Sequence, residues 1–204
     1  MKYVWLPLLF CLGCATQPMD YTNFRKFHPR SILVIPPLNN STDIKGIYSC
    51  LASVTQPIAE MGYYVFPVVV IDEFLKENGM PTPGEMHQIP LKKVSEIINA
   101  DAVLYITIEN YGTKFQVLAS NTQVTLKARL VDTKTGTLLW SGANTQVDSG
   151  DSGSGGLTSM LVYAVASQII NSSTDRSHQI CRMTNSALFT DQNRGLLRGP
   201  YFRE

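Results

Sequence analysis

The strongest constraint on the fold is the segment QVTLKARLVDTKTGTLLWSG (123–142). Apolar and polar side chains alternate along its first part, with Val124, Leu126, Ala128 and Leu130 separated by Thr125, Lys127 and Arg129. This period of two predicts a strand with one buried face and one wet face, and we place that strand at 116–132. Thr133–Gly136 reads as a turn in which Gly136 supplies a positive φ, so the chain returns antiparallel over 137–147.

Three further segments are rich in strand-forming residues. SILVIPP (31–37) predicts a buried strand that two prolines bring to an end. ADAVLYITIENYG (100–112) predicts a second buried strand. YYVFPVVVI (63–71) predicts a third, in which Pro67 restricts hydrogen bonding to a sheet edge or to the strand end.

Helices are predicted between these strands. After a turn at LNNSTD (38–43), the residues Ile47, Leu51, Val54, Ile58 and Met61 form one apolar stripe, with Gly62 as the stop. Pro57 predicts a kink or a break near residue 56. Shorter helices are expected at 72–79 and at 91–99, the latter with Leu91, Val94, Ile97 and Ile98 facing inward. Two more are expected at 157–171 and 176–189, after a Gly/Ser-rich loop (149–156).

The element order β-α-β-α-α-β-β-β-α-α predicts an α/β (α+β) protein, with a mixed sheet of about five strands and helices packed on it. One domain is expected over 31–190, followed by a loop-like C-terminal tail, 191–204. Apolar residues make up 44% of the chain and charged residues 16%, which is typical of a folded protein. A net charge of +1 without a basic stripe argues against nucleic acid as a partner.

The N-terminus has the pattern of a secretory signal peptide. Lys2 precedes an apolar run from Tyr3 to Leu12, and Gly13 stands directly before Cys14. The segment resembles the bacterial lipobox, which implies cleavage after residue 13 and acylation of Cys14 with diacylglycerol and a further acyl chain such as palmitate. Residues 14–30 would then be a lipidated tether. Secretion without lipid and a Cys11–Cys14 metal pair are the alternatives.

Two cysteines remain once Cys11 is removed with the signal peptide and Cys14 is acylated. In an oxidising periplasm Cys50 and Cys181 form a candidate disulfide. Two buried free thiols are the alternative. A bridge requires the two Cα atoms to lie 4.4–6.8 Å apart.

The usual catalytic and metal-binding patterns do not match. DSGDSGSGG (148–156) lacks the lysine of a phosphate loop, and GSGGLTS (153–159) lacks the arrangement of a nucleophile elbow. His178 and Cys181 form H-x-x-C, which is short of the ligands that zinc requires. His28 and His87 are expected in solvent. We therefore predict a non-enzyme with no catalytic residues, no metal and no cofactor.

The quoted blocks also carry a family resemblance. DYTNFRKFHPRSILVIPPLNNSTDIKGIYSCLASVTQPIAEMGYYVFPV (20–68), ADAVLYITIENYGT (100–113) and KARLVDTKTGTLLWSG (127–142) resemble a family of outer-membrane lipoproteins of unknown function, typified by a meningococcal vaccine-candidate antigen. More loosely, the order of elements is similar to the TolB N-terminal domain, to CsgG-like lipoproteins and to lipoprotein activators of peptidoglycan synthases. The resemblance implies a protein-binding envelope module.

These observations define three functional hypotheses. The first is a lipid-anchored outer-membrane lipoprotein on the periplasmic side that binds proteins of an envelope or secretion assembly, with a CsgG-like partner. Ala15 after the acceptor implies the outer membrane, and pairing at a sheet edge is one expected binding mode, with homo-oligomers open. Pro36, Pro37 and Pro67 are candidates for protecting such edges. The second is a regulator of peptidoglycan synthesis, and the third is a periplasmic hydrolase or metal-dependent enzyme using His178.

Overall fold

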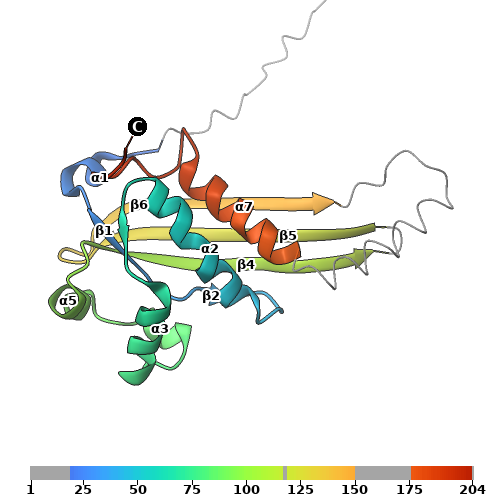
Figure 1. Ribbon diagram of the computed structural model, residues 1–204, viewed down its shortest axis with the longest axis horizontal. Helices are drawn as coiled ribbons and strands as arrows, with labels where there is room; N and C mark the ends of the chain where they lie inside the picture. The colour runs from blue at the N-terminus through green and yellow to red at the C-terminus, as the bar shows by residue number, and fades with distance from the viewer. Residues whose placement is uncertain (1–18, 117–118, 150–175, 204) are drawn as a thin grey trace, which may run out of the picture.

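The computed structural model describes residues 19–116, 119–149 and 176–203 (Figure 1). The helices are α1 (Thr22–Phe27), α2 (Gly46–Glu60), α3 (Val68–Glu77), α4 (Pro83–Met86), α5 (Leu91–Lys93), the π-helix η1 (Val94–Ile98) and α7 (Arg176–Thr190). The strands are β1 (Ser31–Val34), β2 (Leu38–Asn39), β3 (Tyr64–Val65), β4 (Ala102–Gln116), β5 (Ala119–Asp132) and β6 (Leu138–Ser149). The predicted signal peptide, Cys14, most of the Gly/Ser-rich loop and the helix at 157–171 lie outside the described residues.

The strands form one mixed sheet in the order β3-β1-β4-β5-β6, and β2 also pairs with β4. β1 runs parallel to β3 and β4, whereas β4, β5 and β6 form an antiparallel meander. Gly136 in the β5–β6 turn has a φ of 71°, as the turn prediction requires. The α/β class is confirmed, and the described sheet has six strands where about five were predicted.

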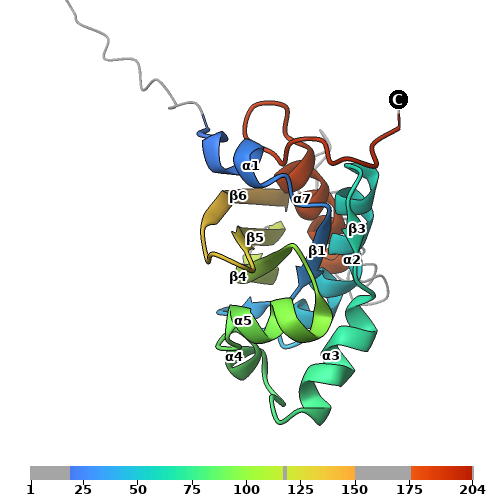
Figure 2. The ribbon, with the colours of Figure 1, turned by 90° about the vertical axis from the view of Figure 1, so that its left-hand side faces the viewer.

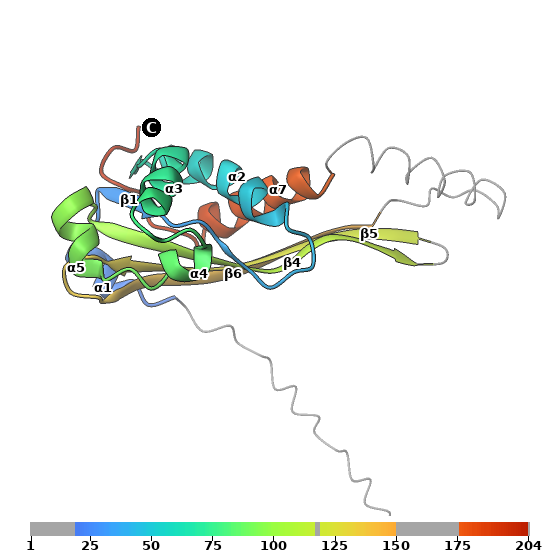
Figure 3. The same ribbon diagram turned by 90° about the horizontal axis from the view of Figure 1, so that it is seen from below.

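One face of the sheet is covered by α2 and α7, which lie side by side along it (Figure 3). The predicted alternation of β5 is confirmed, because its apolar side chains enter this core. The fully buried members of the core include Ile32, Val54, Ile58, Leu104, Ile106, Leu126, Leu130 and Phe189. Burial of each such side chain contributes about 1.5–3 kcal/mol relative to exposure.

The opposite face of the sheet is covered at one end. A second core forms there between β1, β4 and the segment from α3 to η1 (Figure 2). Its members include Leu33, Ile35, Leu75, Met86, Val94, Val103 and Tyr105. Farther along the strands this face carries polar side chains, such as those of Lys127 and Arg129.

Both flanks of the predicted domain pack on the body. Phe24 in α1 is 3% exposed and Leu196 is 4% exposed, so the packed body extends beyond 31–190 on each side. The chain after α7 has no helix or strand in its described part, but hydrogen bonds from two aromatic side chains attach it to the domain. Trp140 Nε1 donates to the carbonyl oxygen of Arg194 at 2.8 Å. The Tyr63 hydroxyl donates to the carbonyl oxygen of Leu197.

The strand predicted at 63–71 is wrong for most of its length. β3 contains two residues, and Pro67 is the residue before α3, which begins at Val68 rather than at residue 72. The physical reason is the period of burial: Ile71 and Leu75, four residues apart, are buried, while Val69 is 76% exposed. The β-branched run 68–71 is therefore helical, with Ile71 on the buried face and Val69 on the exposed face.

Two helix predictions also need correction. Of the kink or break predicted near residue 56, the break does not occur, because α2 continues through Pro57 to Glu60. In η1, Ile97 is 65% exposed rather than inward, because the wider π-helical turn shifts the face that meets the sheet.

Candidate functional site

Cys50 on α2 and Cys181 on α7 are joined by a disulfide, with a Cα–Cα distance of 5.7 Å. Both residues are fully buried between the two helices. The bridge leaves neither sulfur as a thiolate, so Cys181 has no free thiol for an H-x-x-C metal site. The pair is a structural link between the two helices that cover the sheet.

Beside the disulfide, a chain of hydroxyl and imidazole contacts joins three elements. The Tyr111 hydroxyl on β4 donates to Ser49 Oγ on α2 at 2.8 Å, and Ser49 Oγ lies 2.8 Å from His178 Nδ1 on α7. Ser49 precedes Cys50, so this chain and the bridge connect the same helices. A serine–histidine contact is one element of nucleophilic catalysis, and here it also links α2 to α7.

The other histidines differ from each other. His28 is exposed, as predicted, whereas His87 is half-buried and its prediction as a solvated loop residue is wrong. The His87 ring packs against Tyr105 with a centroid distance of 5.2 Å, and its Nε2 lies 3.0 Å from the carbonyl oxygen of Pro36. Burial lowers the pKa of His87, the Pro36 contact raises it, and the nearby Arg129 lowers it further.

Metal ligands do not gather in the described part of the chain, where no three His, Cys, Asp or Glu side chains are placed to hold an ion. Asp148 pairs with Arg176 Nε at 2.7 Å. None of the described helices has the length and apolar character needed to cross a bilayer.

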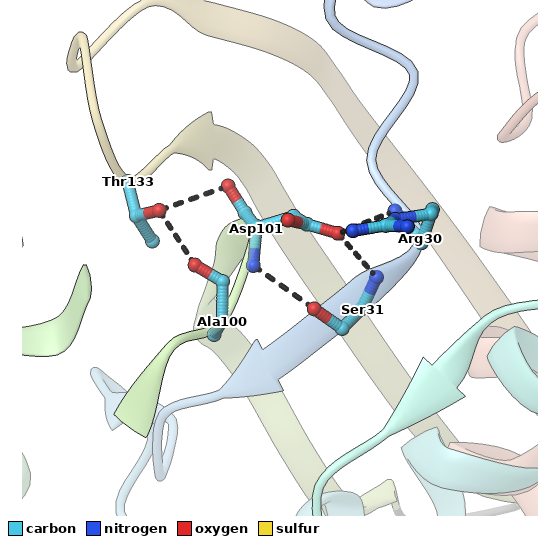
Figure 4. Close-up of polar contacts among 5 residues, drawn as sticks. All are labelled: Arg30, Ser31, Ala100, Asp101 and Thr133. Carbon is cyan, nitrogen blue, oxygen red and sulfur yellow. Dashed lines mark hydrogen bonds and ion pairs between the residues drawn. The ribbon is translucent and has the colours of Figure 1, made fainter. Parts of the chain in front are cut away.

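At one end of the sheet, Asp101 connects three chain segments (Figure 4). Its Oδ2 accepts from the backbone N–H groups of Arg30 at 2.9 Å and Ser31 at 3.2 Å. Its own N–H donates to Ser31 Oγ at 3.0 Å, and Thr133 Oγ1 donates to the carbonyl oxygens of Ala100 and Asp101. Asp101 therefore fixes the start of β1, the start of β4 and the β5–β6 turn relative to one another.

The two edges of the sheet are unequal. The β3 edge is two residues long, and the chain leaves it at Pro67. The β6 edge is 12 residues long and, within the described part of the chain, pairs with β5 alone. Pro36 and Pro37 lie between β1 and β2, which both pair with β4.

The register shows which residues of β6 point their backbone groups outward. The carbonyl of Leu104 accepts from the Ile35 N–H, so the backbone groups of Leu104 point toward β1. Its ladder partner Leu130 therefore points its own N–H and C=O groups away from β4 and toward β6. Leu130 pairs with Trp140, whose backbone groups consequently face β5. The pairing is regular from Trp140 to Ser149. Because the direction alternates, Ser141, Ala143, Thr145 and Val147 present N–H and C=O groups to the outside.

α1 covers the beginning of this edge. Asn23 Nδ2 donates to the carbonyl oxygen of Leu138 at 3.3 Å, and the one irregularity in the β5–β6 register lies near Leu139. Beyond it, the run Ser141–Val147 contains no charge, no proline and no bulge. Charged residues, prolines and bulges are the features by which proteins prevent pairing at a sheet edge, and this run has none of them.

A hollow of about 420 Å³ lies on the polar face of the sheet next to this edge. Its lining residues are Tyr105, Thr107, Lys127, Ala128, Arg129, Ser141, Gly142, Ala143 and Arg194. Lys127 Nζ pairs with Glu109 at 2.9 Å, and the Arg129 guanidinium lies 5.6 Å from the centre of the Tyr105 ring. Three cations and no carboxylate line the hollow.

Comparison with known proteins defines the class. Residues 19–201 match the family model described as "Putative lipoprotein GNA1162-like", and the chain belongs to this family. It is 42% identical over 200 residues to "Putative lipoprotein NMB1124/NMB1162" of Neisseria meningitidis serogroup B (strain ATCC BAA-335 / MC58), covering 98% of this chain and 93% of that protein. The resemblance inferred from the sequence is thereby confirmed.

One solved structure agrees with this assignment. The crystal structure of lipoprotein GNA1162 from Neisseria meningitidis is 48% identical and has a TM-score of 0.58, covering 70% of this chain and 99% of that one. The LpoB C-terminal domain from Salmonella enterica is 15% identical with a TM-score of 0.44, covering 63% and 95%. At that level of similarity the second match carries no argument about function.

Sequence reasoning missed the residues of the open edge and of the hollow. The alternation of β5 places Lys127 and Arg129 on the wet face, but β6 becomes an edge only through the strand order. The contribution of Arg194 was also missed, because the position of the C-terminal tail depends on long-range contacts such as the Trp140 hydrogen bond.

Proposed function

We propose that this lipoprotein is a non-enzymatic binding module that takes up an extended segment of a partner protein along the outer edge of β6. The observation that carries the proposal is the run Ser141–Val147, which is regular, uncharged and paired on one side among the described residues. Strand addition at such an edge obtains its affinity from main-chain hydrogen bonds.

The anchor places this edge at a membrane surface. Acylation of Cys14 attaches the chain to the outer membrane, and the domain faces the periplasm. Three acyl chains hold a protein firmly, because each buried methylene contributes about 0.8 kcal/mol. The described domain starts at Met19, a few residues after Cys14, so its edges lie within reach of other envelope proteins.

We propose the class of partner from the family resemblance. A CsgG-like lipoprotein or another component of an envelope assembly supplies the extended segment. A role in regulating peptidoglycan synthesis would use the same edge with a different partner. The alternative of a hydrolase or metal-dependent enzyme built on His178 loses Cys181 as a ligand or nucleophile, because Cys181 is bonded to Cys50.

The test uses one edge residue whose backbone points outward. Ala143→Pro removes an outward N–H and leaves the β5 ladder intact, because proline is tolerated on the free side of an edge strand. Ala143→Ser keeps the N–H and serves as the matched control. Full-length protein is used to capture partners from detergent-solubilised envelopes, with circular dichroism as the folding check.

We expect a partner that wild type and Ala143→Ser capture equally and that Ala143→Pro loses. Identification of that partner separates a secretion component from a cell-wall synthase. Equal capture by a folded Ala143→Pro variant would contradict the proposal.

A further inference from the structure

We infer that the partner segment carries acidic side chains on alternate residues, which the β6 edge places over the cationic hollow. This inference rests on the proposed function and adds the chemistry of the partner. It follows from the position of the hollow, from the charges that line it and from the geometry of an added strand.

The hollow begins at the β6 edge. Ser141 and Ala143 form part of its lining and have small side chains. A strand added to β6 lies about 4.8 Å from it, and its side chains on this face stand next to those of Ser141 and Ala143. Nothing bulky on β6 separates these positions from Arg129, the partner of Ser141 in the ladder.

Two guanidinium groups are available for an anion. Among the described residues neither Arg129 nor Arg194 takes part in an ion pair, and both are exposed. Lys127 is already paired with Glu109, so its contribution is smaller. Asp191, near Arg194, lines a neighbouring hollow rather than this one. The lining is therefore positive, and arginine binds carboxylates in a bidentate geometry.

The spacing of side chains along the added strand determines which residues of the partner segment should be acidic. Successive side chains on one face of a strand are about 6.6–6.8 Å apart. Acidic residues at alternate positions would therefore all reach the same face, beside Ser141 and Ala143 in turn. A basic segment would be repelled, so the hollow acts on partner choice as well as on affinity.

The experiment selects peptides on the full-length acylated protein in detergent micelles. The probe is a phage-displayed library of random peptides as long as β6. The targets are wild type, the charge-reversed double variant Arg129→Glu/Arg194→Glu, and Lys92→Glu as a control for a distant exposed cation. Each selected peptide is then measured against Ala143→Pro.

We expect wild type and Lys92→Glu to select peptides with Asp or Glu at alternate positions, and the double variant to select Lys or Arg there. Binding of an acidic peptide should weaken by about threefold or more in the double variant and should fall with added salt. Peptides that require the Ala143 N–H but show no acidic pattern would overturn this inference and leave the proposed function standing. If no selected peptide is sensitive to Ala143→Pro, both are overturned.

Discussion

Arg129 on β5 and Ser141 on β6 are direct partners in the antiparallel ladder, and their side chains share the polar face of the sheet. The backbone groups of Ser141 point away from β5, toward the side of β6 on which no other described strand pairs. Ser141 thus offers main-chain hydrogen bonds at the edge, and Arg129 offers a positive charge beside Ser141. This pairing links the geometry of the fold to a specific kind of partner.

The disulfide contributes to stability. Replacing both Cys50 and Cys181 by alanine should lower the free energy of unfolding by about 2–4 kcal/mol, since the bridge closes a loop with a sequence separation of 131 residues. Urea unfolding with and without reductant measures this effect. Reductant should destabilise wild type and leave the double variant unchanged. Equal unfolding midpoints for reduced and oxidised wild type would contradict the expectation.

The C-terminal tail is held by Tyr63. Tyr63→Phe should lower the free energy of unfolding by about 1–3 kcal/mol, because the carbonyl of Leu197 loses its donor while Tyr63 is 4% exposed. Denaturant unfolding gives the value. Tyr201→Phe is the control, since Tyr201 is 59% exposed and its change should stay within about 0.5 kcal/mol. A similar loss in both variants would argue against the role of the Tyr63 hydrogen bond.

His87 gives the fold a pH dependence. Its pKa is lowered from its ordinary value of 6.5, first by burial, so the unfolded chain binds the proton more tightly than the folded one. The contribution of neutral His87 to the free energy of unfolding is fully present above the ordinary pKa of 6.5, and it is lost as the pH falls below that value through the lowered pKa of the folded state. The unfolding free energy of wild type should thus decrease more than that of His87→Gln between about pH 7.5 and about pH 5. Parallel pH profiles would refute this assignment.

The lipid anchor has a direct chemical test. Labelling with palmitate should occur in wild type and in Cys11→Ser, and should be lost in Cys14→Ala, because a single sulfur accepts the diacylglyceryl group. Membrane fractionation of the same strains reports attachment. Undiminished labelling of Cys14→Ala would show that Cys14 is not the acceptor.

The sheet was largely predictable because its signals are local. The alternation of Val124, Leu126 and Leu130 and the positive φ of Gly136 depend on neighbouring residues, and the structure confirms them. The run from Val68 to Ile71 misled the prediction because β-branched residues favour strands on average. Its helical conformation depends on tertiary packing, which buries Ile71 and leaves Val69 in water.

The candidate site was less predictable because it depends on strand order. No local pattern shows that β6 has one neighbour among the described strands, or that Arg194 reaches the hollow. His87 was assigned to solvent from its proline-rich surroundings, but packing against Tyr105 half-buries it. Two cysteines far apart in the sequence suggested a bridge, and the packing of α2 on α7 brings them together.

Photo-crosslinking in living cells tests the central claim most directly. A photoreactive amino acid is placed at Val147 on β6, which is 53% exposed, and in a separate strain at Val69 on α3, which is 76% exposed. The account predicts a discrete crosslinked partner from position 147 that disappears when Ala143→Pro is added, and no such partner from position 69. A partner crosslinked equally from both positions, or one that persists in Ala143→Pro, would contradict binding at the β6 edge.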